Sequence, residues 1–259
     1  MRFLAYFILI YLSLIFILYL FQRQFIYFPS TIQALPEEYG VPEMEVVELK
    51  TDDGLSLKAW YHPAKENQPT MVYFHGNAGH IGSRAIVVSP FLKKGYGVLL
   101  VTYRGYSGNP GTPTEEGLYK DGRAALNFLK NEKCIVLYGN SIGAAVAVQM
   151  ATEFKVQAII LQSPFTSLPD IAWYHYPLLG FKGLLKDQYQ TIEKVDQLTP
   201  PTLVIYGEDD QINPPKFSRR LYQALPDPKK ILAVPRRGHN DLFVPEQIIY
   251  YITKYINCS

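Results

Sequence analysis

The feature that most constrains the fold is the pentapeptide Gly-Asn-Ser-Ile-Gly at residues 139–143. It lies between a short apolar run, residues 134–138, and a run of small, helix-forming residues, 144–151. A serine at such a sharp strand-to-helix turn adopts a strained backbone that lifts its hydroxyl above the sheet, and the glycines let neighbouring backbone approach closely. We therefore predict a nucleophile elbow with Ser141 as the nucleophile. The N-terminus of the following helix would favour the negative charge that develops during attack, which suits acyl transfer.

The N-terminus carries the second informative pattern. Residues 3–21 contain no charged side chain and are long enough to cross about 30 Å of hydrocarbon as a helix. The run ends at Gln22 and Arg23, whereas a signal peptide would end in small residues at a cleavage site. A buried amphipathic helix would need a polar face, which this run lacks. We therefore predict that residues 1–24 form an uncleaved, single-pass transmembrane anchor in contact with membrane lipid.

Residues 25–42 are predicted to form an interfacial segment and connector. We interpret the aromatic rings of this segment and the preceding Arg23 as an interfacial belt, in which rings and a snorkelling cation lie among the lipid headgroups. The rings belong to Phe25, Tyr27 and Phe28. Positive residues flank the anchor on both sides, so they set its orientation only weakly. We expect the N-terminus to be cytoplasmic and the rest of the chain to be non-cytoplasmic.

Residues 43–259 are expected to form one catalytic domain, because 48% of the 259 residues are hydrophobic, which is enough for a sizeable core. The net charge of +2 is mild and the basic residues are scattered, which argues against a nucleic-acid partner. Cys134 and Cys258 show no disulfide or metal-ligand spacing, and we expect Cys134 to be a buried core thiol. No metal or cofactor is expected, and the oligomeric state stays open.

Strand and helix patterns alternate along this domain. An antiparallel hairpin is predicted at residues 44–49 and 55–61. Short apolar runs then predict strands buried on both faces, at residues 70–74, 98–102, 134–138, 158–161, 202–206 and 230–234. Helical patterns fall between them, at residues 117–130, 142–153, 215–224 and 245–255. The alternation predicts an α/β fold with a mostly parallel central sheet flanked by helices in three layers.

Residues 163–199 interrupt this alternation with a longer, aromatic-rich insertion, which we expect to form a small cap over the site. Trp173, Tyr174 and Tyr176 would offer an apolar wall to an acyl chain and are candidate substrate-binding residues. Ordinary packing of a connecting helix explains the same aromatic residues equally well.

The candidate nucleophile needs partners, because a serine hydroxyl attacks at neutral pH only when a base takes its proton and an acid orients that base. The loop after the second-to-last predicted strand carries Glu208, Asp209 and Asp210. The loop after the last predicted strand carries His239, next to a glycine and before the final helix. His239 is therefore the candidate base, and the acid is expected among the three carboxylates.

A glycine-rich loop, His-Gly-Asn-Ala-Gly at residues 75–79, directly follows the predicted strand 70–74. Such a loop can present backbone N–H groups to the oxyanion of a tetrahedral intermediate, and each donor contributes about 2.7 to 4 kcal/mol. The N–H groups of Asn77 and of Ile142, the residue after the nucleophile, are the candidate donors. We expect His75 to fix this loop as a structural side chain.

Several motifs occur together and in order along the chain. They are the loop at residues 75–79, Tyr-Arg-Gly-Tyr-Ser-Gly at 103–108, Pro-Thr-Glu at 113–115, Gly-Leu-Tyr-Lys-Asp at 117–121, the elbow, and the loops that carry the acids and the histidine. Over residues 22–257 the chain resembles membrane-anchored serine hydrolases with an α/β-hydrolase domain.

This resemblance implies the α/β-hydrolase fold and a triad of Ser141, Asp210 and His239. It also implies oxyanion donors at Asn77 and Ile142, and hydrolysis of esters or thioesters without a cofactor. Some such proteins remove palmitoyl groups from other proteins, but they anchor through an N-terminal cysteine cluster that this chain lacks.

The sequence thus predicts a membrane-anchored serine hydrolase that cleaves acyl esters or thioesters through an acyl-Ser141 intermediate. Its substrate would be a small molecule, a lipid or an acylated protein. A serine peptidase of the same fold is the nearest alternative, and a non-catalytic, membrane-tethered binding protein is another, because fold alone does not imply activity. Dehalogenases and epoxide hydrolases are excluded, since they carry an aspartate at the elbow.

Overall fold

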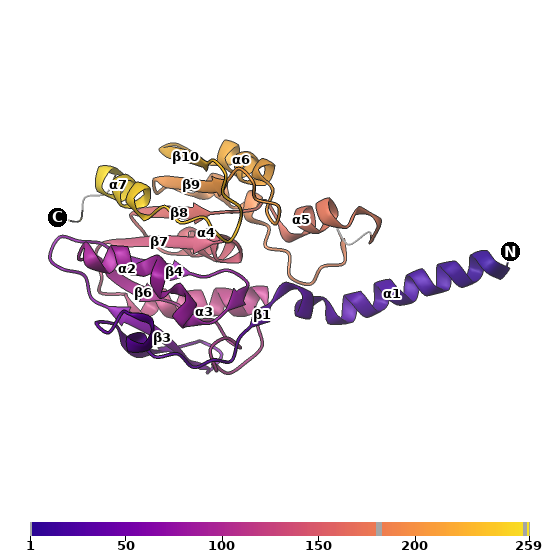
Figure 1. Ribbon diagram of the computed structural model, residues 1–259, viewed down its shortest axis with the longest axis horizontal. Coiled ribbons are helices and arrows are strands. Elements are labelled where there is room, and N and C mark those ends of the chain that lie inside the picture. Colours follow the sequence, from indigo (N-terminus) through magenta and orange to yellow (C-terminus); the bar gives the residue numbers. More distant parts are fainter. Residues whose placement is uncertain (1, 180–182, 256–257, 259) are drawn as a thin grey trace.

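A computed structural model describes residues 2–179, 183–255 and 258 of the chain. The strands of its central sheet are β2 (Glu45–Lys50), β3 (Ser56–His62), β4 (Thr70–Phe74), β6 (Gly97–Leu100), β7 (Ile135–Asn140), β8 (Ala158–Gln162), β9 (Thr202–Gly207) and β10 (Lys229–Val234). Their order across the sheet is β10-β9-β8-β7-β4-β6-β3-β2 (Figure 1). The strands from β10 to β6 run parallel, whereas β3 is antiparallel to both of its neighbours. The predicted hairpin is therefore present at one edge of a mostly parallel sheet.

Helices cover both faces of this sheet. They are α2 (Ala85–Lys93), α3 (Glu115–Phe128), α4 (Ile142–Glu153), α6 (Pro215–Ala224) and α7 (Pro245–Tyr255), with 3-10 turns η1 (Pro36–Tyr39) and η2 (Ile81–Arg84). Side chains of β4 alternate between two core clusters: Val72 and Phe74 pack with α3, α4 and α6, while Met71 and Tyr73 pack with α2 and α7. Two apolar layers on one sheet explain why β4 is buried along its whole length. The predicted three-layer α/β architecture is confirmed.

The N-terminal helix α1 (Arg2–Ile26) leaves the domain (Figure 1). Its segment Phe3–Ile26 contains an 18-residue window with a mean hydropathy of 2.6 and is long enough to cross a membrane. No residue of this window is buried by the rest of the described chain, whereas a helix of the same composition in a protein core would be covered. The helix is therefore a candidate membrane anchor.

The polar end of α1 is bound to the domain. The guanidinium of Arg23 donates two hydrogen bonds to the carboxylate of Asp187, at 2.8 and 3.1 Å. Tyr27 is only 4% exposed, and its hydroxyl lies 2.8 Å from the hydroxyl of Tyr189. Tyr27 is therefore buried in protein, and the interpretation of its ring as part of an interfacial belt is wrong. The side chain of Arg23 is still 41% exposed, and its place in such a belt stays a prediction. The other two rings of that belt are exposed, those of Phe25 and Phe28.

The chain continues from α1 into the domain with almost no linker. Tyr27 alone separates α1 from the short strand β1 (Phe28–Pro29), which pairs in parallel with β5 (Ala78–Gly79). The N–H of Phe28 donates to the carbonyl oxygen of Asn77 at 2.8 Å, and the N–H of Ser30 donates to that of Gly79 at 3.1 Å. Through β1, the helix α1 is thus joined directly to the glycine-rich loop that follows β4.

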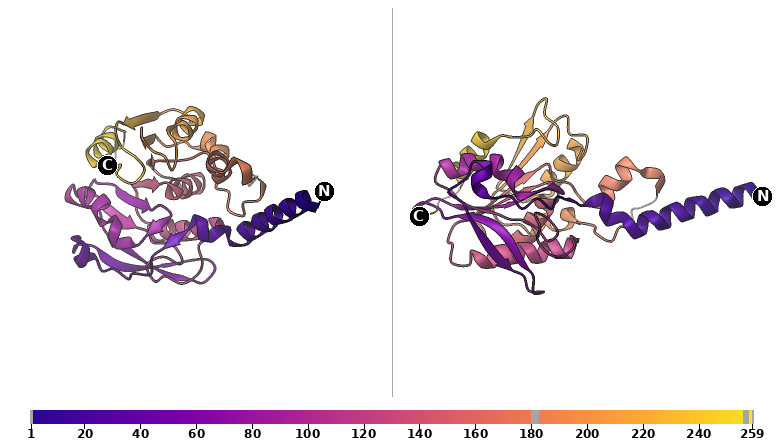
Figure 2. Two further views of the ribbon diagram at one scale, coloured as in Figure 1. Left: turned by 45° about the vertical axis from the view of Figure 1, so that its right-hand side comes forward. Right: turned by 60° about the horizontal axis from the view of Figure 1, so that its bottom comes forward.

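The insertion between β8 and β9 consists of α5 (Leu168–His175) and the 3-10 turns η3 (Pro177–Leu179), η5 (Thr191–Glu193) and η6 (Val195–Gln197). The hydroxyl of Ser167 caps α5 by accepting a hydrogen bond from the N–H of Asp170 at 3.2 Å. Both views in Figure 2 show α5 and the turn after it beside α1.

The two cysteines are joined by a disulfide, so the expectation that Cys134 is a buried thiol is wrong. The bond links the residue before β7 to Cys258 beyond α7, over a sequence separation of 124. Two cysteines so far apart give no local spacing signal, and only the packing of α7 onto the sheet brings them together.

Candidate active site

Ser141 occupies the turn between β7 and α4, with φ of 56° and ψ of −118°. A positive φ is strained for a residue with a side chain. A side chain on Gly139 would collide with the backbone of Gly143, and one on Gly143 would collide with the carbonyl oxygen of Phe74. Both positions therefore require glycine, and the local sequence forces the strand-turn-helix geometry around Ser141.

His239 and Asp210 lie in contact in the loops that follow β10 and β9. Nδ1 of His239 is 2.8 Å from Oδ2 of Asp210. The other carboxylate oxygen accepts two backbone N–H groups of its own loop, at 3.0 and 2.8 Å, and Asp210 is only 3% exposed. Glu208 and Asp209, the other two acids of this loop, are exposed. Asp210 is thus the acid that contacts His239, and its orientation is fixed by its loop.

The predicted nucleophile, acid and base lie at one edge of the sheet, because parallel strands place their carboxyl ends together. Ser141 follows β7, Asp210 follows β9 and His239 follows β10. Between them, Gln162 at the end of β8 donates from Nε2 to the carbonyl oxygen of Leu242 at 3.0 Å. This bond draws the loop that carries His239 across the end of β8 towards the elbow. Among the described residues, the hydroxyl of Ser141 makes no hydrogen bond, as is common for such a serine without substrate.

The glycine-rich loop lies beside Ser141, since a Cβ placed on Gly76 would be 3.5 Å from the Cβ of Ser141. The carbonyl oxygen of Asn77 accepts hydrogen bonds from the Tyr106 hydroxyl at 2.7 Å and from the first residue of β1 at 2.8 Å. Its N–H, in contrast, has no acceptor in the described part of the chain. Ile142 begins α4, and the first N–H groups of a helix have no acceptor within it. Both predicted donors are therefore close to Ser141.

His75 is buried under this loop as a neutral side chain. Its ring lies 4.3 Å from the ring of Tyr103 and 4.9 Å from that of Tyr106, between centroids. Nδ1 donates to the carbonyl oxygen of Gly76 at 2.6 Å. Burial lowers the pKa of His75 to about 3. These contacts agree with the expected structural role.

A buried ion-pair cluster around Arg104 supports the glycine-rich loop. In the sequence, Arg104 and Asp121 were noted only as members of the motifs at residues 103–108 and 117–121. Arg104 donates from Nε and from its backbone N–H to the carboxylate of Asp121, at 2.9 Å each. Its Nη1 donates to Asp53 at 2.8 Å, and this bond holds the pKa of Asp53 well below its usual range. The neighbouring Tyr103 hydroxyl donates to the carbonyl oxygen of His75 at 3.3 Å. Arg104 thus fixes the segment on which the glycine-rich loop rests.

The aromatic candidates of the insertion lie at the surface. Trp173 is 50% exposed, Tyr174 46% and Tyr176 60%. The ring of Tyr174 packs against Phe217 and under the ammonium of Lys216, 3.8 Å from the ring centroid. Within the described residues, none of the three has a hydrogen bond or ring contact to the predicted triad. Their role in substrate binding stays a prediction.

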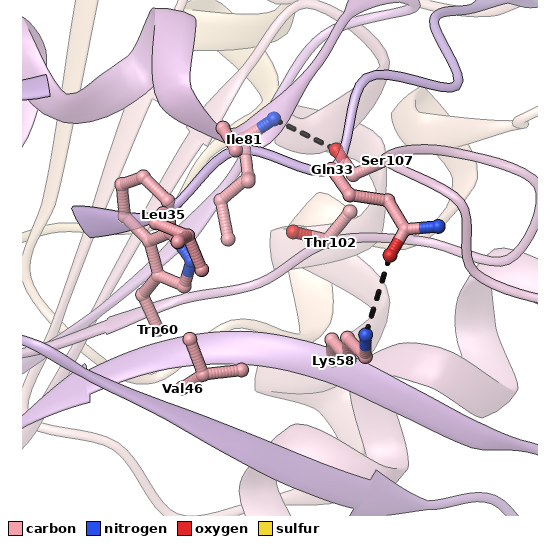
Figure 3. A pocket seen from close by; sticks show the side chains of 9 residues that line it. Gln33, Leu35, Val46, Lys58, Trp60, Ile81, Thr102 and Ser107 are labelled. Atoms are coloured by element: carbon pink, nitrogen blue, oxygen red, sulfur yellow. Dashed lines mark hydrogen bonds between the residues drawn. The ribbon is translucent and has the colours of Figure 1, made fainter. Parts of the chain in front are cut away.

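A cavity of about 190 Å³ lies elsewhere, between the hairpin β2–β3 and the segment that precedes it (Figure 3). The hydroxyl of Thr102 lines it and is buried without a hydrogen-bond partner. None of the predicted site residues lines this cavity. Over residues 2–179, 183–255 and 258, no cluster of three His, Cys, Asp or Glu side chains could hold a metal ion.

Comparison with known proteins agrees with this geometry. A family model described as serine aminopeptidase, S33, matches residues 65–190. Protein Rv2307c of Mycobacterium tuberculosis is 40% identical over 227 residues, which cover 85% of this chain and 81% of the relative. Membrane protein YNL320W of Saccharomyces cerevisiae is 31% identical over 247 residues, which cover 88% and 86%.

Solved structures show the same fold. The Pyrococcus furiosus esterase Pf2001 superposes with a TM-score of 0.71 at 18% identity, over 89% of this chain and 97% of that one. The α/β hydrolase GrgF from Penicillium sp. sh18 gives a TM-score of 0.67 at 20% identity, over 82% and 97%. With its elbow, its strand order and these relatives, the chain belongs to the α/β-hydrolase superfamily.

Proposed function

We propose that this protein is a membrane-anchored serine hydrolase that cleaves acyl esters or thioesters. The observation that carries the proposal is the 2.8 Å contact between His239 and a buried Asp210, at the same sheet edge as Ser141 in its strained turn. A histidine oriented by a buried carboxylate is the usual activator of a serine nucleophile. The esterase named among the solved structures of this fold adds support.

In the proposed reaction, Oγ of Ser141 attacks the acyl carbonyl carbon while Nε2 of His239 takes its proton. Asp210 accepts the hydrogen bond from Nδ1–H, which keeps Nε2 unprotonated beforehand and stabilises the imidazolium afterwards. His239 then gives the proton to the leaving alcohol or thiol, and acyl-Ser141 remains. A water molecule deprotonated by His239 attacks the acyl carbon, the bond from that carbon to Oγ of Ser141 breaks, and His239 returns the proton to Oγ as the carboxylic acid is released.

The backbone N–H groups of Asn77 and Ile142 are proposed to donate to the oxyanion of both tetrahedral intermediates. The unpaired N–H of Asn77 supports this role, since a donor that must wait for an oxyanion should have no acceptor in the free protein. Each such donor contributes about 2.7 to 4 kcal/mol to transition-state stabilisation.

A serine peptidase is the second candidate, favoured by the description of the matching family model as a serine aminopeptidase. Ester and amide hydrolysis share the acyl-serine chemistry, so the same residues would serve both reactions. The two functions differ in the leaving group. Turnover of aminoacyl p-nitroanilides that equals or exceeds turnover of p-nitrophenyl esters would favour the peptidase.

We further propose that α1 spans the membrane and that the domain is non-cytoplasmic. The uncovered apolar surface of α1 and the description of YNL320W as a membrane protein support the anchor. The disulfide between Cys134 and Cys258 supports an oxidising compartment, where such bonds persist.

Labelling of the detergent-solubilised full chain with a fluorophosphonate probe tests the function. Wild type should be labelled, and Ser141→Ala and His239→Ala should not. Ser163→Ala is the matched control, because Ser163 is also a buried serine with positive φ at the end of the neighbouring strand β8. Labelling that survives in Ser141→Ala, or is absent from folded wild type, would contradict the proposal.

A further inference from the structure

A group of exposed apolar side chains begins in the second half of α5 and continues beyond it, and we call residues 171–179 and 183–186 the aromatic lobe. Leu178 is 85% exposed, more than any other apolar residue of the described domain beyond α1. The described residues of the lobe include no Asp or Glu and one lysine, Lys186. Its other exposed large side chains are Trp173, Tyr174, Tyr176 and Leu184. Such an apolar, weakly basic surface is typical of segments that lie in a membrane interface.

The aromatic lobe contacts the apolar helix α1 directly. The hydroxyl of Tyr11 donates to the carbonyl oxygen of Leu178 at 2.8 Å. The ammonium of Lys186 lies 4.6 Å from the ring centroid of Tyr19. The side-chain oxygen of Gln22 accepts the N–H of Lys186 at 2.6 Å. The lobe therefore runs alongside α1 and does not merely lie near its end.

The chemical character of these contacts changes along α1, from charged at its domain end to uncharged farther from the domain. The charged contacts involve its domain end, where Arg23 pairs with Asp187 and Lys186 lies over Tyr19. Leu178 meets α1 at Tyr11, eight residues earlier, which is about 12 Å along a helix axis. A bilayer that receives α1 would therefore surround the tip of the lobe with acyl chains while its lysine reaches the headgroups.

The hydrogen bond between Tyr11 and Leu178 fits such an environment. A backbone carbonyl in hydrocarbon has no water to bind, so it is tolerated only when a protein donor satisfies it. The phenol of Tyr11, within the apolar stretch of α1, likewise needs a partner there. The Tyr11 hydroxyl therefore supplies the donor that the Leu178 carbonyl oxygen needs, and the carbonyl oxygen supplies the acceptor for the hydroxyl.

We propose that the aromatic lobe inserts into the leaflet nearest the domain, beside the domain half of α1, and that the acyl substrate is a lipid of that leaflet. Nε2 of His175 lies 3.0 Å from the carbonyl oxygen of Ile212, two residues after Asp210, so the lobe connects the bilayer to the loop of the predicted acid. The other side of the site is bound to α1 itself, because the Asn77 side chain donates to the carbonyl oxygen of Ile26, the last residue of α1, at 2.9 Å. The insertion rests on α1 as an anchor, and the substrate class rests on the proposed hydrolase activity.

Tryptophan fluorescence in vesicles of brominated phosphatidylcholine tests the insertion. The chain has two tryptophans: Trp173 in the lobe and Trp60, which is 1% exposed in the sheet. With the full chain reconstituted in these vesicles, bromine should quench the fluorescence that Trp173 contributes in wild type. In Trp173→Phe the remaining fluorescence comes from Trp60, and bromine should not quench it. Trp173 fluorescence that survives in protein bound to the vesicles would overturn the proposal. A blue emission of Trp173 that resists bromine would mean that protein covers the lobe, which overturns it as well.

A matched pair of variants isolates the lobe. Tyr176 is 60% exposed, and Tyr250 is 62% exposed on α7, which lies at the end of the molecule away from α1 (Figure 1). Tyr176→Glu should lose most of the quenching of Trp173, and Tyr250→Glu should keep it. Leu178→Glu is the second lobe variant, at the most exposed position. Equal quenching in all three variants would contradict insertion.

Measurements of ester hydrolysis test the proposed lipid substrate separately from the proposed insertion of the lobe. With 4-methylumbelliferyl oleate dissolved in the vesicles and the acetate ester in water, Tyr176→Glu should lower oleate turnover relative to acetate turnover, and Tyr250→Glu should not. An unchanged ratio would overturn the lipid substrate. If neither ester is cleaved by wild type, the hydrolase proposal fails, while bromine quenching still decides the insertion.

Discussion

The side-chain amide of Asn77 donates a hydrogen bond of 2.9 Å to the carbonyl oxygen of Ile26, the last residue of α1. The last carbonyl groups of a helix have no acceptor role within it, so this one is available to an outside donor. Because the N–H of Asn77 is a proposed oxyanion donor, one residue joins the end of the anchor helix to the proposed site.

Asn77→Ala would keep the backbone N–H and remove the bond to Ile26. We expect kcat for p-nitrophenyl butyrate to fall about tenfold with KM little changed, because a misplaced donor weakens the transition state more than substrate binding. Loss of a whole donor would cost about 10²–10³-fold, so the variant should retain more activity than that. An unchanged kcat would show that the loop does not depend on α1.

Asp210→Asn should keep the size of the side chain but favour the wrong tautomer of His239, whose Nε2 would then carry the proton. We expect kcat to fall by about 10⁴-fold, as in other triads that lose their carboxylate in this way. The control is Asp209→Asn, at the neighbouring exposed acid, which should leave kcat unchanged. Equal losses in the two variants would argue that the loop, and not the carboxylate, matters.

His75 should make stability depend on pH. Its pKa is about 3 in the folded chain because of burial, against a usual value of 6.5, so the unfolded chain takes up a proton first as the pH falls. This contribution is present above pH 6.5 and is lost as the pH falls towards 3. Between about pH 7.5 and about pH 5, wild type should lose about 2 kcal/mol more unfolding free energy than His75→Gln, as measured by urea denaturation in detergent micelles. Parallel pH profiles would contradict the buried, neutral histidine.

Cys258→Ser should lower the stability of the domain by about 2 to 4 kcal/mol, because the disulfide closes a long loop in the unfolded chain. Thermal unfolding with and without dithiothreitol measures this effect. The reductant should lower the Tm of wild type to that of the variant and leave the variant unchanged. Freely titratable thiols in oxidised wild type would show that the bond does not form.

The fold and the proposed triad were largely predictable because their signals are local. The central strands are continuous apolar runs, since both faces of the sheet are covered, and the elbow needs glycines at two fixed offsets from Ser141. From the residues alone, the acid of the triad could have been any of three neighbouring carboxylates. The family resemblance implied Asp210, and the loop conformation, which exposes Glu208 and Asp209 and buries Asp210, agrees with it.

The errors concern contacts between distant segments. Tyr27 follows an apolar helix in a segment with the composition of a membrane interface, yet its partner Tyr189 lies more than a hundred residues away. The disulfide spans a similar distance. Nothing in the neighbourhood of these residues indicates such a partner, because these pairs exist only once the insertion and α7 have packed.

If α1 is the proposed membrane anchor, the junction at Tyr27 holds the proposed active site at a fixed height above the bilayer. A flexible tether would let a domain move freely above its anchor. Here a single residue separates α1 from β1, and the Arg23–Asp187 and Tyr27–Tyr189 contacts fix the junction. With α1 in a bilayer, the elbow stays at one level above it and at one tilt. Diffusion then occurs only in the plane, and bonds that stand farther out from the surface are beyond reach.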